Sequence, residues 1–227
     1  MLIWGAITTV YSDNINMHGK FLSYFFLFIS GSLSGQNQGY YPADFWKKNT
    51  EALVFDLKLE PLSIKKTNFH FRFWSTGQVI DIWKDSSNLL YGEITNYAKQ
   101  YDEMNLGKRT FYSSRLPIDQ GNATAIYQLI LQSSITSIPT ADAINGWAKN
   151  ADGFTYIVEC IDSVKYSFKC YLSPASQGGL QQAMTIESFL EKLDQLLKLK
   201  KRYKSFSSSI PFWCYTRGMP EVICRKK

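Results

Sequence analysis

Alternating apolar and polar residues between positions 153 and 174 predict a β-hairpin at the centre of the chain. Apolar side chains recur at every second position of both arms, at Tyr156, Val158, Cys160, Val164, Tyr166, Phe168 and Cys170. Successive side chains of a strand point to opposite faces, so the pattern predicts one apolar face and one polar face. A loop centred on Asp162 and Ser163 would pair Val158 with Tyr166. This register would place all the apolar side chains on the same face.

Earlier segments show the same alternation and predict further strands. They are residues 53–59, 68–75, 79–84, 89–101 and 109–116, the last stopped by Pro117. In the second segment, three Phe side chains share one face, and His70, Arg72 and Trp74 share the other. Tight turns rich in Gly, Ser and Asn separate several of these segments, which is typical of an antiparallel meander.

Helical spacing of apolar residues appears in three places. Pro42 is suited to the first position of a short helix over residues 40–46. Asn122 is a candidate cap for a helix that ends near Ser133. The strongest pattern is Ile186, Phe189, Leu190, Leu193, Leu196 and Leu197. With a small second hairpin expected at residues 212–224, the predicted fold is α+β: an antiparallel sheet (meander plus central hairpin) with two main helices packed on one face.

The beginning of the chain resembles an export signal. A basic start at residues 17–20, an apolar run at 21–30 and small residues at Ser32 and Ser34 are typical of a signal peptide cut before Gly35. We therefore interpret residues 1–16 as a start-site artefact, 17–34 as the signal peptide and 35–227 as a single α+β domain. The run is shorter than the roughly 20 residues of a membrane-spanning helix, so we expect a secreted or periplasmic protein without a transmembrane segment. Alternatively, residues 21–29 form a buried strand or helix.

The four cysteines are consistent with export. Cys160, Cys170, Cys214 and Cys224 form an even set without a CxxC pair, so disulfides are plausible in an oxidising compartment. The two hairpin cysteines are expected to lie too far apart along the ladder to join each other. We therefore expect bridges from the hairpin to the C-terminal segment, and the alternative is four buried free thiols.

Composition and charge narrow the class of protein. Hydrophobic residues make up 45% of the 227 and charged residues 19%, which is typical of a globular protein. The net charge of +6 comes from residues 192–227, which contain ten Lys or Arg and two acidic residues. The chain as a whole therefore lacks the general basic character of a nucleic-acid-binding protein, and we expect no specific nucleic-acid partner.

The basic residues of this last segment gather around the end of the last predicted helix. They are Lys198, Lys200, Lys201, Arg202 and Lys204. Cations at the end of a helix complement its dipole, which is one explanation of the cluster. Binding to an anionic surface or polymer is the other.

The order of these elements resembles a set of uncharacterised secreted bacterial proteins of no assigned function. The likeness rests on residues 72–74 (RFW) before 79–82 (VIDI), and on 152–153 (DG) before 156–159 (YIVE). Tyr166, Tyr171, Ser173 and Pro174 complete it, followed by a helix. The resemblance implies an exported α+β domain and nothing about its chemistry.

Few residues are suited to catalysis. After cleavage, His70 would be the only histidine, so any catalytic triad would have to use it. Asp81 lies between two Ile residues, and Glu159 lies on the polar face of the central hairpin. An acid held among apolar groups is a candidate proton donor or acceptor, although most strand acids are solvated or paired. The chain has no GxSxG, GxxxxGK[ST], GxGxxG or HExxH motif, and we expect neither a metal nor a cofactor.

Arg72, Trp74 and Trp83 are candidates for a ligand-binding strip on the sheet. Aromatic and cationic side chains together suit sugar rings, peptides or another protein. The alternative is that a helix or the C-terminal segment covers them as part of the core.

Three functions stay open from the sequence. The first is a non-enzymatic exported module that binds a protein, a glycan or an anionic surface through the sheet face or the basic segment. The second is a small hydrolase that uses His70, Asp81 or Glu159. The third is a structural component of the envelope or of a secretion system.

Overall fold

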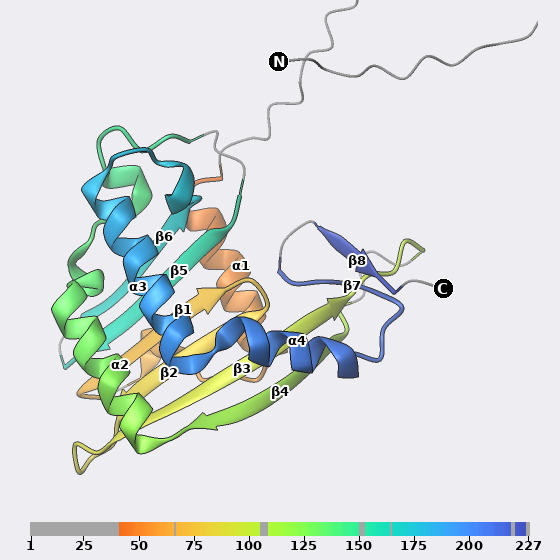
Figure 1. Cartoon of the computed structure of the whole chain (residues 1–227), viewed down its shortest axis with the longest axis horizontal. Helices are drawn as coiled ribbons and strands as arrows, with labels where there is room; N and C mark the ends of the chain where they lie inside the picture. Colours follow the sequence, from red (N-terminus) through yellow and green to blue (C-terminus); the bar gives the residue numbers. More distant parts are fainter. Residues whose placement is uncertain are drawn as a thin grey trace, which may run out of the picture. The chain divides into compact units, whose positions relative to one another are not determined.

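The computed structural model describes residues 41–65, 67–104, 109–149, 153–163, 165–218 and 221–225. The predicted signal peptide at residues 17–34 and the segment 1–16 lie outside these ranges. Within them the chain folds as an α+β protein around an antiparallel sheet, as the alternating patterns predict (Figure 1).

Every strand pair of the described sheet is antiparallel. The strands are β1 (Phe69–Ser75), β2 (Gln78–Lys84), β3 (Leu90–Gln100), β4 (Phe111–Ile118), β5 (Thr155–Asp162), β6 (Lys165–Leu172), β7 (Cys214–Thr216) and β8 (Val222–Cys224). Their order is β6-β5-β1-β2-β3-β7-β8, and β4 also pairs with β3. The meander, the central hairpin and the C-terminal hairpin of the sequence analysis are therefore confirmed.

Helices cover both faces of the sheet. They are α1 (Ala43–Asp56), α2 (Gln120–Ser133), α3 (Gln181–Leu197) and α4 (Leu199–Ser209). Short 3-10 turns occur at Leu62–Ile64, Ile135–Ser137, Ala141–Ala143 and Pro174–Ser176. Figure 1 shows α2 and α3 side by side on one face, as predicted, with α1 on the opposite face. The sheet is therefore buried on two sides, and its second face, called here the α1 face, is not simply a solvated surface.

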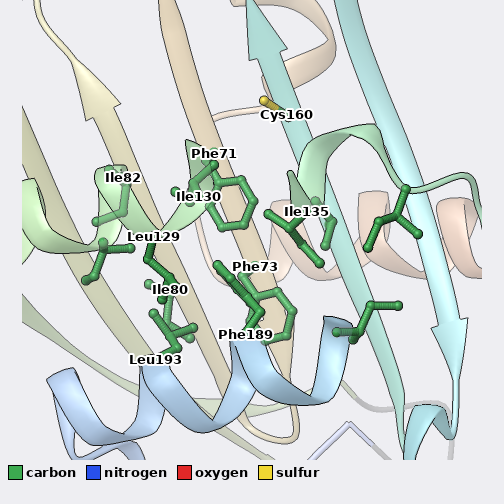
Figure 2. Packing of buried hydrophobic residues seen from close by; sticks show 14 of the residues in the cluster. Phe71, Phe73, Ile80, Ile82, Leu129, Ile130, Ile135, Cys160, Phe189 and Leu193 are labelled. Carbon is green, nitrogen blue, oxygen red and sulfur yellow. The ribbon is translucent and has the colours of Figure 1, made fainter. Parts of the chain in front are cut away.

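The larger core lies between the sheet and the helices α2 and α3. Phe71 and Phe73 of β1 are fully buried, and both rings lie 5.9 Å from the ring of Phe189 on α3. Ile80 and Ile82 of β2 extend the same layer (Figure 2). This face matches the row of Phe side chains that the alternation of residues 68–75 predicts.

The strand predicted at residues 53–59 is wrong, because α1 continues through Asp56. The alternation of apolar residues there is coincidental, since Phe55 is 83% exposed. The residues that α1 buries are Thr50 and Val54, which are four positions apart and so share one face of a helix.

The predicted register of the central hairpin is also wrong. Val158 pairs with Lys169, three positions from the expected Tyr166, because the strands already pair at Asp162 and Lys165. A shift by an odd number of residues moves every side chain of one strand to the other face. Both faces of this hairpin are covered, so burial of an apolar row does not select a single register.

Two helix boundaries differ from the expectation. Asp119, not Asn122, caps α2, because its side chain accepts a hydrogen bond from the Asn122 backbone at 2.9 Å. The last predicted helix is two helices, since Lys198 adopts a left-handed conformation between α3 and α4. The basic residues at 200–204 therefore begin α4 instead of ending a helix, and a favourable helix dipole does not explain them.

The expected disulfides between hairpin and C-terminal segment are wrong. Cys214 and Cys224 form a disulfide that joins β7 to β8, where the two residues are directly paired. Cys160 and Cys170 are free and buried. The register places them on opposite faces of the sheet, Cys160 towards α2 and α3 and Cys170 towards α1. Burial raises the pKa of the Cys160 thiol to about 12, so this thiol is unreactive near neutral pH.

Candidate functional site

A row of charged side chains crosses the α1 face. Glu159 of β5, Arg72 of β1, Asp81 of β2 and Glu93 of β3 lie opposite one another in the sheet register. The first three are buried, and Glu93 is half-buried. This buried polar row brings two of the three candidate catalytic residues beside a candidate ligand-binding residue.

Arg72 neutralises the centre of the row. Its Nε donates to Asp81 Oδ1 at 2.8 Å, and its Nη1 donates to the carbonyl oxygen of Glu60 at 3.0 Å. Only 2% of its surface is exposed. The segment that follows α1 therefore covers this part of the strip proposed from Arg72, Trp74 and Trp83.

His70 is the second partner of Asp81. Its Nε2 lies 2.6 Å from Asp81 Oδ1, which also accepts from Arg72, so the histidine nitrogen is the donor. Burial lowers the pKa of His70, while the Asp81 carboxylate opposes this effect. The buried Nδ1 has no hydrogen-bond partner among the residues that the structure describes, as expected of a neutral ring.

The lowered pKa of His70 predicts a pH-dependent stability. The unfolded chain takes up a proton below the ordinary histidine pKa of about 6.5, and the folded chain resists it. Stability from this group is therefore complete above pH 6.5 and is lost as the pH falls towards the folded pKa, by at most about 1.4 kcal/mol per pH unit. Urea unfolding measures the free energy of unfolding at pH 7 and at about pH 5. Between these pH values, His70→Gln should lose less of this free energy than the wild type. Equal losses of unfolding free energy in the two proteins would contradict the attribution of this pH dependence to His70.

Glu159 accepts hydrogen bonds from two side chains. Trp74 Nε1 donates to it at 2.6 Å, and the Tyr166 hydroxyl donates at 2.8 Å. Burial and the nearby Glu159 raise the pKa of Tyr166, so the phenol keeps its proton. Glu159 and Tyr166 also line a cavity of about 190 Å³ between α1 and the central hairpin.

The three candidate catalytic residues therefore lie on the same face of the sheet but do not line one open cleft. His70 and Asp81 bind each other, and Glu159 binds Trp74 and Tyr166. These contacts hold the α1 face together, and they do not favour hydrolysis. Within the described ranges, no three His, Cys, Asp or Glu side chains are grouped as metal ligands.

A larger cavity of about 570 Å³ opens next to this row, between the N-terminal half of α1 and one end of the sheet. We call it the aromatic pocket. Its aromatic lining residues are Tyr41, Phe45, Trp46, Trp74, Tyr97, Tyr101 and Phe111. Tyr41 and Phe45 are stacked with ring centroids 4.2 Å apart, and both are exposed. Its size lies within the range of small-molecule binding sites.

The charges of the aromatic pocket are positive. Lys99, Arg109 and Arg217 line it, and no Asp or Glu is among its described lining residues. Arg109 forms an ion pair with Asp56, which neutralises it. Arg217 pairs with the exposed Glu221, while Lys99 has no ion-pair partner among the described residues. The pocket therefore combines aromatic surfaces with one cation, Lys99, that no described acidic side chain neutralises.

Arg72, Trp74 and Trp83, the residues of the proposed ligand-binding strip, do not form one continuous surface. Trp74 is 3% exposed, yet it forms part of the wall of the aromatic pocket. Trp83 lies at the opposite end of the paired strands, stacked on Tyr91 at 6.0 Å. Of the proposed basic cluster, Lys198, Lys200, Lys201, Arg202 and Lys204 are all exposed.

Most pocket residues were not among the sequence candidates. Lys99 and Phe111 come from neighbouring strands, and Phe45 and Trp46 come from α1. The one signal in the sequence is the density of aromatic residues at 40–46, where four of seven are Tyr, Phe or Trp.

Comparisons with known proteins do not assign a family. No protein-family model matches the chain, and neither does any curated protein. None of the helices in the described part of the chain has the length and apolar character needed to cross a membrane.

Proposed function

We propose that this protein is an exported binding module that holds a ligand carrying both a ring and a negative charge in the aromatic pocket. The observation that supports it most strongly is the lining itself: seven aromatic residues together with Lys99, a cation that has no ion-pair partner among the described residues. Aromatic faces pack against planar rings and against the C–H faces of sugars, and Lys and Arg bind carboxylates through charge-assisted hydrogen bonds. An acidic sugar meets both requirements.

Two contacts hold parts of the wall of the proposed site in place. Trp74 is held by its hydrogen bond to Glu159, and Gly218 approaches Tyr97 so closely that a Cβ would lie 2.7 Å from its hydroxyl oxygen. A pocket preformed in this way loses little conformational entropy when the ligand binds.

Export is the second part of the proposal. The signal-like segment at residues 17–34 supports it, and so does the Cys214–Cys224 disulfide, since disulfides persist in oxidising compartments. The intact mass of the exported protein is expected to correspond to a chain that begins at Gly35. A mass that retains residues 17–34 would contradict the cleavage.

Titration with digalacturonic acid, followed by tryptophan fluorescence, tests the ligand class. We expect saturable binding that weakens with salt, and no binding of the neutral disaccharide cellobiose. Trp46→Ala and Lys99→Glu should each lower the affinity at least tenfold, about 1.4 kcal/mol, because each removes a direct contact.

Trp213→Ala is the matched control for Trp46→Ala. Trp213 is 51% exposed and is not part of the pocket lining, so its removal should leave the affinity unchanged. Binding that is equally weakened by Trp213→Ala, or absent in the wild type, would contradict the proposed site.

A further inference from the structure

A second cleft lies on the other side of the β1–β2 turn. Its volume is about 410 Å³, and we call it the α4 cleft. Its lining includes Ser75, Thr76, Lys200, Tyr203, Lys204 and Arg217. Ser75, Thr76 and Arg217 also line the aromatic pocket, so the two hollows are adjacent.

The turn that separates the two hollows has no large side chain. Gly77 has a φ of 73°, and a Cβ at this position would lie 2.6 Å from Tyr203 Cε2. The absence of a side chain therefore lets the turn pack directly against α4. Ser75 and Thr76, the other residues of the turn, are small and half-buried, so no large side chain of the turn separates the hollows.

The α4 cleft is also cationic. Lys200 and Lys204 are one helical turn apart on α4, and both are exposed. Lys200 lies 3.7 Å from Asp194, but its side chain is 91% exposed, so this pair is weak. No Asp or Glu is among the described residues of this lining either.

Arg217 lies between the aromatic pocket and the α4 cleft. Its guanidinium lies over the Tyr203 ring at 5.8 Å, and it belongs to the linings of both hollows. The Cys214–Cys224 disulfide closes the hairpin that carries it. Cations are thus present in the aromatic pocket, at the turn and in the α4 cleft, which matches a ligand with repeated negative charges better than one with a single charge.

We infer that the ligand is a chain of acidic sugars, an anionic polysaccharide, which occupies the aromatic pocket and continues over the β1–β2 turn into the α4 cleft. This inference rests on the proposed function and adds the length and repeating charge of the ligand. Sugar rings stack in the aromatic pocket, and carboxylates of later sugars bind Arg217, Lys200 and Lys204. A single-stranded nucleic acid also has rings and repeated charges, but the disulfide and the signal-like leader favour a polyanion that occurs outside the cytoplasm.

The test compares digalacturonic acid with an octamer of the same sugar. We expect the octamer to bind at least tenfold more tightly, with a steeper loss of affinity as salt is added. A longer chain can bind the aromatic pocket in several registers, which raises its affinity without new contacts. Variants of the α4 cleft therefore test whether this cleft contacts the octamer. Lys200→Glu combined with Lys204→Glu should reduce the gain of the octamer to the statistical part that these registers supply and change the affinity for the dimer less than twofold.

The charge-matched control is Lys192→Glu combined with Lys201→Glu. Both residues are exposed, and neither lines either hollow, so the gain should persist. A gain that is undiminished in Lys200→Glu with Lys204→Glu would overturn the extended site and leave the proposed function standing. Binding of neither sugar would overturn both. Tighter binding of a single-stranded oligothymidylate than of the octamer would overturn the assignment to a polysaccharide.

Discussion

Replacing Arg72 with methionine is expected to lower the free energy of unfolding by about 3–5 kcal/mol, the usual cost of breaking a buried ion pair. The guanidinium is 2% exposed and neutralises Asp81 at 2.8 Å. Without it, the Asp81 carboxyl group is left away from water with only His70 as a donor, and the carbonyl of Glu60 also loses its partner. Urea denaturation followed by circular dichroism measures the loss.

Arg217→Met is the control for this experiment. In its ion pair with Glu221 the arginine side chain is 29% exposed and the glutamate 61%, so its removal should cost less than about 1 kcal/mol. Replacing Asp81 by leucine as well should recover part of the loss of Arg72→Met, since the buried Asp81 carboxylate is then removed together with its guanidinium partner. A cost for Arg72→Met no larger than that of the control would contradict a stabilising role for the polar row.

The strands of the meander could be predicted because one of their faces is mostly apolar. In β1, Phe69, Phe71 and Phe73 all point to the core under α2 and α3. The alternation is a direct record of that burial. The spacing of apolar residues in α3 is equally regular, since Ile186, Phe189 and Leu193 all face the same core.

The other face could not be predicted in the same way. His70, Arg72 and Trp74 alternate with the Phe row and look like a solvated surface, but all three are buried. They are satisfied by partners on β2 and β5 and by the segment after α1. A sequence pattern records polarity, and it does not show whether polar groups meet water or each other.

The candidate site was predicted only in part, because its residues come from separate parts of the chain. Trp74 was identified from the pattern of one strand, while Trp46 and Lys99 reach the same pocket from α1 and β3. The role of Arg217 depends on the disulfide of the C-terminal hairpin, and the sequence analysis paired those cysteines differently. Which elements meet around a pocket is a property of the tertiary fold.

Phe73→Ala is expected to be the other large effect, with a loss of about 3–5 kcal/mol in the free energy of unfolding. The ring is fully buried between the sheet and α3, with Phe189 at 5.9 Å and Tyr156 at 5.8 Å, so its removal leaves a cavity that rigid neighbours do not fill (Figure 2). Phe55→Ala deletes the same atoms from a position that is 83% exposed, and it should change stability by less than about 0.5 kcal/mol. The same urea titration measures both. Similar losses in the two variants would show that Phe55 is buried, as the strand expected at residues 53–59 requires, and would contradict the helix that places it in solvent.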